Sequence, residues 1–326
     1  MLTSLNLTNF RGFEHLEIPK FASVNLIGGV NNAGKTGILE AIYLLLEQNP
    51  DRLRELPGLF RALSGVNEDK YFWRWLTRNG STTDVVEIQG NVQPIGSVEV
   101  KWAPAHVAVG LQGFRGVVEA GNRQLVQKLY DSAPLRLWPR PEVFSPRPSK
   151  PIEDAQVYIQ AAKKTVDGEE RIEELLREIE PRLKRVRAYP DEQTNQPLIH
   201  VGLDFGEALP APQLGQGFNR LLRIYSALIG ADAKVFLIDE IETGLHHTVL
   251  PTIWKGLAAV ARKEQVQVFA TTHSRETILA AHRVFSQEPS YDFAYHRLER
   301  AGGKISVVTY DQEALAGADE ANFEVR

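Results

Sequence analysis

The sequence predicts an α/β protein with a mostly parallel core sheet, and three stretches support this prediction. Val24–Ile27, Val235–Ile238 and Val266–Ala270 are short, mostly apolar runs, as expected of parallel strands buried on both faces. Each run is followed by polar residues and then by a segment in which apolar residues recur at helical spacing. Strands and helices therefore alternate, which is the pattern of an α/β sheet.

The amino-acid composition is that of a globular protein, with 43% hydrophobic and 24% charged residues. No apolar run reaches the roughly 18 residues of a membrane span, and the N-terminus does not resemble a signal peptide. The absence of cysteine rules out disulfides and cysteine-based metal sites, and it fits a cytoplasmic location. Because the formal net charge is −4, any contact with nucleic acid must come from a local basic patch.

The length of 326 residues allows one large or two ordinary domains. We assign a single domain, residues 1–326. Its core is expected over residues 1–50 and 198–326, with a small antiparallel β subdomain at about 83–120 and a helical insertion at about 152–190.

The N-terminal residues predict two strands ahead of the first apolar run. Leu5–Phe10 alternates polar and apolar residues, Arg11–Phe13 forms a turn, and Leu16–Ile18 begins a second strand. The apolar run Val24–Ile27 is then the third strand, and it leads directly into a glycine-rich turn.

The glycine-rich turn fits the phosphate-loop pattern G-x-x-x-x-G-K-[ST], and helical spacing begins directly after it. Glycines let the backbone wrap a phosphate with its N–H groups inward, while the helix N-terminus points at the same place. Lys35 would reach the β- and γ-phosphates of a nucleotide, and the Thr36 hydroxyl would ligate Mg²⁺. The residues assigned to nucleotide binding are Gly29, Asn31, Asn32, Ala33, Gly34, Lys35, Thr36 and Gly37.

The middle of the chain is less specific. From Asp84 to Glu119, short alternating runs separated by Gly, Pro and Asn predict a small antiparallel sheet. Residues 134–151 hold six of the eighteen prolines, which predicts a crossing segment or a linker and not a helix. From Ile152 to Arg187 the apolar residues share one helical face, so a helix is expected there, kinked or restarted at Pro181.

Four cations close this helical pattern. They are either a solvated helix end, where cations suit the helix dipole, or a contact for nucleic acid or an acidic partner. Further cations in the proline-rich segment would extend such a contact. The candidate DNA-binding residues are Arg182, Lys184, Arg185 and Arg187, with Arg136, Arg140, Arg147 and Lys150.

The C-terminal part predicts further alternating elements. Ile199–Phe205 is a strand, and an amphipathic helix follows Leu214–Arg220, with Gly230 placed to cap it. Helices are expected at 248–263 and 276–286. The chain closes with a hairpin of Phe293–Leu298 and Lys304–Thr309, turned at Gly302-Gly303.

Polar residues with catalytic chemistry stand at the ends of two buried strands. Asp239 and Glu240 follow one strand and His273 follows the next, so they are expected in the crevice where open α/β sheets bind ligands. Asp239 would hold Mg²⁺, and Glu240 would act as the general base toward water. His273 is either structural or a group that senses or stabilises the γ-phosphate.

Segments near both ends of the chain resemble ABC-type ATPases of the RecF, structural-maintenance-of-chromosomes (SMC) and OLD group. The most similar branch is a compact bacterial set of AAA-family ATPases that is OLD-like. The segments that carry the resemblance are Leu7–Phe13, Asn31–Thr36, Leu237–His246, Thr271–Ser274 and Glu324–Arg326. It covers about residues 1–46 and 200–326, while the middle of the chain is generic.

The resemblance implies a P-loop NTPase fold of the ABC-ATPase type, ATP and Mg²⁺ as cofactors, and a head-to-tail homodimer on ATP binding. The phosphate loop of one subunit would face the signature segment of the other, here Leu214–Arg220. Gly215 stands where the usual Leu-Ser-Gly-Gly-Gln has serine, and Gln216 replaces a glycine, which affects the usual serine contact with the γ-phosphate. The residues assigned to this contact in trans are Gly215, Gln216, Gly217 and Asn219.

Three further expectations rest on the same resemblance. Arg11 is expected near the nucleotide. The glutamine of the usual Q-loop is not identifiable, and Gln89, Gln93 and Gln112 are weak candidates. OLD proteins carry a C-terminal Toprim nuclease, but only about 50 residues follow His273 here, without an Asp-x-Asp motif. We therefore expect no nuclease in cis, and a separate effector protein becomes a candidate partner.

Three functions remain open from the sequence. The first is an ATPase whose nucleotide-driven dimerisation serves DNA maintenance or phage defence. The second is a nucleotide-dependent switch that scaffolds a partner with little hydrolysis, against which Asp239-Glu240 argues weakly. The third is a transporter nucleotide-binding subunit, which the unusual signature segment argues against.

Overall fold

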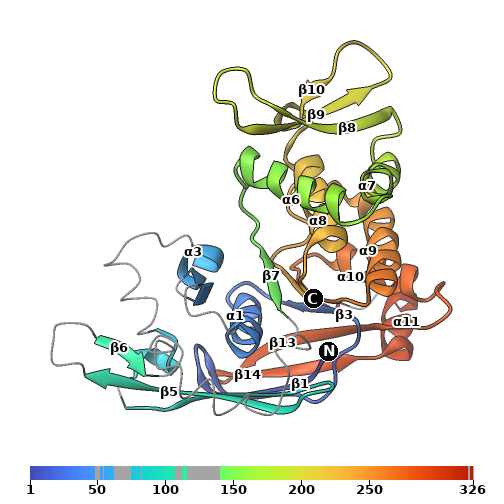
Figure 1. The fold of residues 1–326 in the computed structure, drawn as a ribbon. Coiled ribbons are helices and arrows are strands. Elements are labelled where there is room, and N and C mark those ends of the chain that lie inside the picture. The colour runs from blue at the N-terminus through green and yellow to red at the C-terminus, as the bar shows by residue number, and fades with distance from the viewer. Residues whose placement is uncertain are drawn as a thin grey trace.

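The fold was analysed in a computed structural model that describes residues 1–47, 52–53, 55–61, 75–81, 83–106, 112–115, 140–321 and 324–325 (Figure 1). Two sheets form its lower part, and a lobe of helices with a small sheet at its tip rises above them (Figure 1). Among the described residues, no helix is both long and apolar enough to cross a membrane.

The core is a six-stranded sheet that is parallel apart from one edge strand. Its order is β14–β13–β3–β12–β11–β7, and only β14 runs antiparallel to its neighbour. The three apolar runs are the adjacent strands β3, β12 and β11, so the predicted α/β class is confirmed. The strands are β3 (Val24–Gly29), β7 (Pro141–Phe144), β11 (Val235–Ile238), β12 (Gln267–Thr271), β13 (Phe293–Ala301) and β14 (Lys304–Tyr310).

Strand β7 lies in the proline-rich segment, which was expected to be a crossing segment or a linker. Its four residues pair in parallel with β11, from Pro141 opposite Val235 to Phe144 opposite Ile238. Proline is tolerated there because β7 is an edge strand and Pro141 is its first residue. A four-residue strand bounded by prolines carries no periodic signal of its own, so only its pairing with β11 identifies it.

The second sheet is antiparallel and has the order β2–β1–β4–β5–β6. The strands expected near the N-terminus and in the β subdomain therefore share one sheet, because β4 pairs with β1. Residues 107–111 and 116–120 of that predicted subdomain lie outside the described residues. The strands are β1 (Leu2–Phe10), β2 (Phe13–Ile18), β4 (Val86–Val92), β5 (Gly96–His106) and β6 (Gln112–Arg115).

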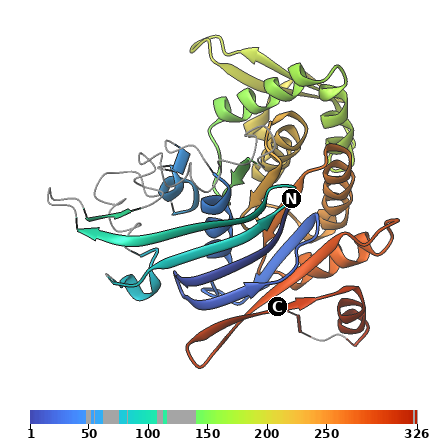
Figure 2. The same ribbon diagram turned by 60° about the horizontal axis from the view of Figure 1, so that its bottom comes forward.

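Helix α1 (Lys35–Leu46) is packed between the two sheets. Ten of its twelve residues are buried, in one apolar cluster with side chains of both sheets, such as Leu5 of β1 and Leu237 of β11. Figure 2 shows the antiparallel strands running beneath this helix. Short α3 (Leu56–Arg61) and the 3₁₀ turn η1 (Arg78–Gly80) flank it. The helix that starts at the phosphate loop is thus fixed from both sides.

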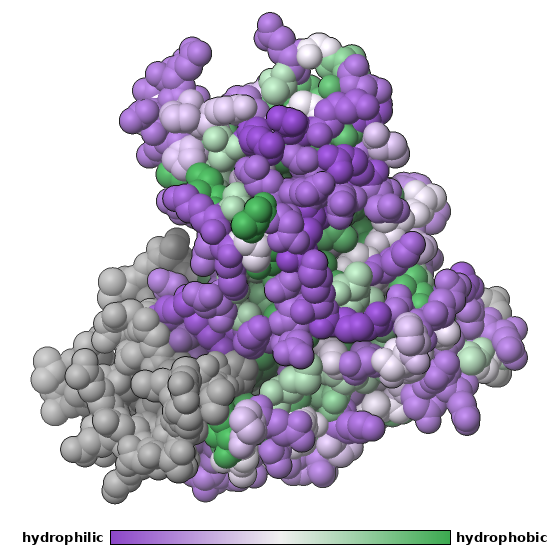
Figure 3. Space-filling view, turned by 45° about the vertical axis from the view of Figure 1, so that its right-hand side comes forward, coloured by the Kyte–Doolittle hydropathy of each residue, from purple (hydrophilic) through white to green (hydrophobic). Residues whose placement is uncertain are grey.

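The lobe consists of helices and a three-stranded sheet of order β10–β9–β8. β9 confirms the strand expected at Ile199–Phe205, but it pairs with β8 in the lobe and not with the core sheet. The outer face of the lobe is mainly hydrophilic (Figure 3). Its elements are α6 (Pro151–Lys164), α7 (Gly168–Arg177), β8 (Leu183–Pro190), β9 (Pro197–Leu203), β10 (Leu209–Pro210), η3 (Ala211–Leu214) and α8 (Gln216–Gly230).

The expected helix from Ile152 to Arg187 is wrong over its last part, where the chain forms strand β8. Leu183 and Val186 are both buried, and their spacing of three residues imitates a helical face. The register shifts between Leu183 and Arg185, and such a bulge adds one residue to the ordinary two-residue period of a strand. The bulge therefore produced the misleading spacing.

Three further helices cover the core sheet and complete the chain. α9 and α10 confirm the two helices expected after β11 and β12, and β13–β14 confirms the hairpin turned at Gly302-Gly303. Both turn glycines have positive φ, of 58° and 80°, as a two-residue hairpin turn requires. The helices are α9 (Leu250–Glu264), α10 (Arg275–Phe285) and α11 (Gln312–Glu320), with the 3₁₀ turn η4 (His247–Val249) before α9.

Gly230 does not cap α8 as expected, because the helix includes it and α6 packs directly on it. A Cβ atom at Gly230 would lie 2.5 Å from the Cα of Ala161. We expect Gly230→Ala to lower the free energy of unfolding by about 1–3 kcal/mol, the usual cost of overpacking. Gly317→Ala is the matched control, since Gly317 lies in α11 with nothing within 4 Å of such a Cβ. Urea denaturation measures both, and equal stabilities of the two variants would contradict this packing argument.

Candidate functional site

The expected site lies at the carboxyl edge of the core sheet, where β3, β12 and β11 end side by side. The phosphate loop connects β3 to α1, and two of its glycines are required by the backbone. Gly29 and Gly34 have φ of 133° and 100°, in the region that favours glycine. A Cβ at Gly34 would also lie 2.7 Å from the Phe13 ring. Strand β2 therefore holds the loop from behind.

The Lys35 side chain folds over this loop. Its ammonium group donates to the carbonyl oxygens of Gly29 at 2.8 Å and Val30 at 3.1 Å. Burial lowers the pKa of Lys35, and the negative charges of Asp239, Glu242 and Glu240 oppose that effect. The ammonium group over the loop thus lies near three carboxylates at the strand ends.

Thr36 and Asp239 meet although 203 residues separate them. The Thr36 hydroxyl donates to both carboxylate oxygens of Asp239, at 3.1 and 3.3 Å. The Thr271 hydroxyl at the end of β12 donates to Asp239 Oδ1 at 2.6 Å. Burial raises the pKa of Asp239, and the bonds from Thr271 and Thr36 lower it.

These groups fit a magnesium ion. Asp239 is 6% exposed, and among the described residues it forms hydrogen bonds to hydroxyls but no ion pair with a cation. A buried carboxylate beside a hydroxyl provides the hard oxygen ligands that Mg²⁺ prefers. Thr36 and Asp239 are therefore the residues that would hold it.

Glu240 occupies a tightly constrained turn after β11. Its φ of 50° is in the left-handed region, and its N–H donates to the Thr271 hydroxyl at 2.8 Å. The Thr243 hydroxyl donates to Glu240 Oε2 at 3.1 Å. Arg220 of α8 donates through Nη2 to the carbonyl oxygens of Asp239 and Glu240, at 2.6 and 3.0 Å. The position of Glu240 thus depends on contacts from two other elements.

His273 is held by an acidic residue that the sequence reasoning missed. Its Nδ1 lies 3.2 Å from Glu242 Oε1, and its backbone N–H donates to the same oxygen at 3.0 Å. The Thr272 hydroxyl also donates to Glu242 Oε1, at 2.8 Å. The only signal in the sequence was a third acidic residue two positions after Glu240. The imidazole is half-exposed, at the carboxyl end of β12.

Arg11 lies beside the start of α1 but points at a carboxylate. Its Cγ would lie 3.9 Å from a Cβ at Gly37, and its Nε donates to the buried Glu40 at 2.8 Å. Arg61 donates to the other Glu40 oxygen at 2.7 Å. Burial lowers the pKa of Arg11, and Glu40 raises it. Arg11 is thus next to the phosphate-loop helix, in an Arg–Glu–Arg cluster around the buried Glu40, in which the Arg61 side chain is exposed.

The signature segment begins α8 and packs against the loop that follows Glu240. Gly215 has φ of 90° and precedes the first helical residue, Gln216. A Cβ at Gly217 would lie 2.3 Å from the carbonyl oxygen of Gly244. Asn219 donates to the carbonyl oxygens of Ala211 and Gly215, at 2.8 and 2.7 Å. Among the described residues, no hydrogen bond links this segment to the phosphate loop of the same chain.

The weak Q-loop candidates do not lie at the carboxyl edge of the core sheet. Gln89 is on β4 and bonds to Glu99, and the Gln93 N–H donates to the Met1 carbonyl. Gln89 is thus in the antiparallel sheet and Gln93 in the turn that follows β4, while the side chain of Gln112 lies outside the described residues. Strand β7 is the edge strand beside β11. The residues that follow it, Ser145 and Pro146, do not provide a Q-loop glutamine.

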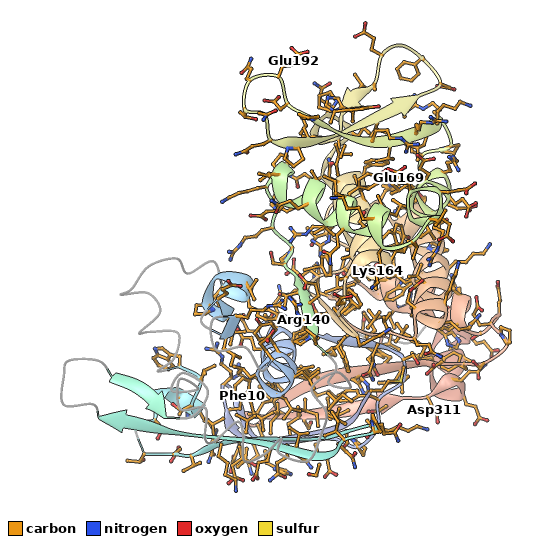
Figure 4. All side chains as sticks on the ribbon, in the orientation of Figure 1. Phe10, Arg140, Lys164, Glu169, Glu192 and Asp311 are labelled. Atoms are coloured by element: carbon orange, nitrogen blue, oxygen red, sulfur yellow. The ribbon has the colours of Figure 1, made fainter. Side chains whose placement is uncertain are left out.

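The seven candidate DNA-binding cations among the described residues are divided between two parts of the structure. Arg182 pairs with Glu180, and Arg187 pairs with Glu169 and Glu173, so Lys184 and Arg185 are the exposed cations left on β8. This strand belongs to the sheet at the tip of the lobe, whose hairpin end is marked by Glu192 in Figure 4. The expected helix end is therefore an exposed strand.

The remaining cations are placed by β7. Arg140, labelled in Figure 4, directly precedes this strand. Arg147 and Lys150 follow the strand, so they lie toward its other end. All three are exposed. Arg136 lies outside the described residues.

Two family models match this chain, and both are described as AAA domains. A model described as "AAA domain, putative AbiEii toxin, Type IV TA system" matches residues 119–280, and an "AAA ATPase domain" model matches residues 1–99. An ATP/GTP phosphatase of Helicobacter pylori is 25% identical over 90% of both chains. The DNA replication and repair protein RecF of Nitrosococcus oceani is 48% identical over 14% of this chain and 12% of its own.

Solved structures of similar fold include SMC heads. An SmcHead bound to the C-winged helix domain of ScpA superposes with a TM-score of 0.61 at 14% identity, over 97% of this chain and 99% of that one. The Smc head with an extended coiled coil from Pyrococcus furiosus, bound to the C-terminal domain of ScpA, gives 0.55 at 11% identity, over 98% and 99%. These likenesses show the fold.

Proposed function

Because the chain is an ABC-type AAA ATPase of the RecF/SMC-like group, we propose that it binds ATP with Mg²⁺ at Gly29–Thr36 and hydrolyses it. The observation that carries this proposal is the contact of Thr36 with Asp239, at 3.1 Å. In this contact the phosphate-loop hydroxyl lies next to the carboxylate at the end of β11. Two oxygen ligands of one metal ion must lie close together in this way. Thr36→Ala and Asp239→Ala should each abolish magnesium-dependent release of phosphate from ATP, and full activity of either would contradict the proposal.

Each side chain of the site has a separate role in hydrolysis. Lys35 binds the β- and γ-phosphates in place of the carbonyl oxygens of Gly29 and Val30. When bound, Mg²⁺ neutralises charge that develops on the phosphates. Glu240 takes a proton from the attacking water, and His273, held by Glu242, contacts the γ-phosphate.

A head-to-tail homodimer would complete this site. Within one chain, the start of α8 packs on Gly244 and makes no hydrogen bond to the phosphate loop among the described residues. Its free N–H groups and the glycines Gly215 and Gly217 are available to a phosphate from the second subunit. Gln216 and Asn219 border the same helix start. We propose that two ATP molecules are enclosed between two chains in this way.

The process served by the ATPase is proposed to be DNA maintenance or defence against phage. The local match to RecF supports the first, and the family model that covers residues 119–280 names a toxin–antitoxin system. A nucleotide switch for a separate effector protein is the second candidate. The bond from Thr243 to Glu240 favours it, because a hydrogen bond donated to the carboxylate makes it a weaker base.

DNA contact by the tip of the lobe is directly testable. If β8 binds duplex DNA, reversal of Lys184 and Arg185 to glutamate should weaken binding uniformly across sequences and reduce its salt dependence. Basal ATP hydrolysis should stay unchanged. Lys255→Glu with Arg300→Glu is the matched control, because it makes the same change in net charge at exposed positions on α9 and β13. Electrophoretic mobility shifts at several salt concentrations measure the effect. No binding by the unmodified chain at low salt would exclude DNA and favour a protein effector.

A further inference from the structure

A second cavity lies beside the proposed ATP site, between β7, α6 and α8. Its volume is about 420 Å³. The segment that leaves β7 forms one wall, and one face of α8 forms the opposite wall. The charged residues that line it are Arg147, Lys150, Glu153, Asp154, Arg220 and Arg223. Positive charges thus exceed negative charges by two.

Two arginines on the α8 wall carry buried N–H groups without partners. Arg220 and Arg223 are three residues apart, so they share one helix face. Nε and Nη1 of Arg220 and Nε of Arg223 are buried and make no hydrogen bond within the part of the chain that the structure describes. Burial lowers the pKa of Arg220, which shows that its charge is poorly solvated there. Buried polar groups almost always have partners, so three unpaired donors on two residues that line one cavity point to a ligand.

The neighbouring carboxylates approach Arg223 at a different nitrogen, Nη1. Arg223 Nη1 lies 3.7 Å from Asp154 and 3.8 Å from Glu153, beyond hydrogen-bond distance. The Ser149 hydroxyl already donates to Asp154. The Arg223 guanidinium lies over the Phe144 ring, 5.7 Å from its centre, and this contact fixes its plane. Three nitrogens of the two guanidinium groups, Nε and Nη1 of Arg220 and Nε of Arg223, therefore remain without a partner among the described residues.

From these donors we propose that the cavity binds a phosphate-bearing small molecule, at a site separate from the phosphate loop. Guanidinium groups recognise phosphate through paired N–H donors. Three donors from two side chains suit the several oxygens of a phosphate better than the two of a carboxylate. Val143, Phe144 and Ile199 also line the cavity, which leaves an apolar wall for the organic part of such a ligand.

The site is coupled to the turn that holds Glu240, and this part of the inference rests on the proposed function. The third donor of Arg220 already bonds to the carbonyl oxygens of Asp239 and Glu240. A phosphate bound to its other donors fixes the guanidinium and hence this turn. Thr243, which donates to Glu240, lines the same cavity. The bound molecule therefore changes the rate of ATP hydrolysis.

Calorimetric titration with pyrophosphate tests the site in a Lys35→Ala background, which removes the main cation of the phosphate loop. We expect one binding site that weakens at least tenfold on adding Arg223→Gln, with an intermediate loss for Arg223→Lys, which keeps the charge but not the fork. Arg182→Gln, just before β8 and outside the cavity lining, should leave the affinity unchanged. Thermal unfolding without ligand verifies that each variant is folded. No binding, equal affinity of the Arg223→Gln variant, or equal binding of succinate would overturn the proposal.

ATP turnover separates this proposal from the proposed function. With Lys35 intact, the Arg223→Gln variant should hydrolyse ATP at the basal rate. Pyrophosphate should affect this variant only by competing with ATP at the phosphate loop. The unmodified chain should show an additional response. If pyrophosphate binds as expected but no variant hydrolyses ATP, the hydrolysis proposal fails and the site stands. If hydrolysis is normal and both proteins respond equally, the coupling fails and the ATPase stands.

Discussion

Replacement of Lys35 by alanine is expected to abolish measurable ATP binding. The Lys35 ammonium group is the cation that the structure places over the phosphate loop, where it donates to two backbone carbonyl oxygens. On ATP binding these bonds give way to phosphate oxygens. Each charged hydrogen bond contributes about 1.5–3 kcal/mol, so the loss of two corresponds to a decrease in affinity of about 10²–10⁴-fold.

Isothermal titration with ATP and Mg²⁺ measures this effect. Lys255→Ala is the matched control, because Lys255 is exposed on α9 and makes no ion pair among the described residues. Its affinity should equal that of the unmodified chain. Equal affinity of the Lys35→Ala variant would remove Gly29–Thr36 from the role of nucleotide site.

Replacement of Glu240 by glutamine is expected to leave ATP binding intact and to slow hydrolysis by about 10²–10⁴-fold, the usual contribution of a general base. Glutamine retains the size of the side chain and can still accept a hydrogen bond from Thr243. It cannot take a proton from water, so bound ATP persists. If ATP joins two chains, the variant should accumulate as an ATP-dependent dimer.

Phosphate release and light scattering of the same samples provide the two readouts. Glu178→Gln is the control, since Glu178 is an exposed residue at the end of α7 and far from the site in sequence. Near-normal turnover of Glu240→Gln would exclude Glu240 as the base. Slow turnover without any ATP-dependent dimer would leave the base in place and contradict the proposed dimerisation.

Local features of the sequence were sufficient to predict the α/β class and the phosphate loop. The backbone of that loop depends on glycines at Gly29 and Gly34, whose conformational freedom is a property of the residue itself. The apolar runs that became β3, β11 and β12 also needed no long-range information, because strands buried on both faces must be apolar. The hairpin at Gly302-Gly303 was predictable because its turn also depends on the conformational freedom of glycine.

Features that depend on a partner elsewhere in the chain were not predictable. Strand β7 exists because β11 offers it a free edge. Strand β8 has two buried residues at helical spacing only because of a bulge against β9. Gly230 serves the close approach of α6 and not the end of its own helix. In each case the deciding neighbour lies outside the element itself.

The candidate site also has a part that is predictable from the sequence and a part that is not. The sequence by itself determined which residue types are present for nucleotide chemistry, namely Lys35, Thr36, Asp239 and Glu240. Only the tertiary structure decided their partners: Thr36 with Asp239, His273 with Glu242, and Arg220 with the turn at Glu240. It also left buried donors of two α8 arginines unpaired in a cavity. The physical reason is that hydrogen bonds and burial depend on distances in space, which the order of strands in the sheet sets and the local sequence does not.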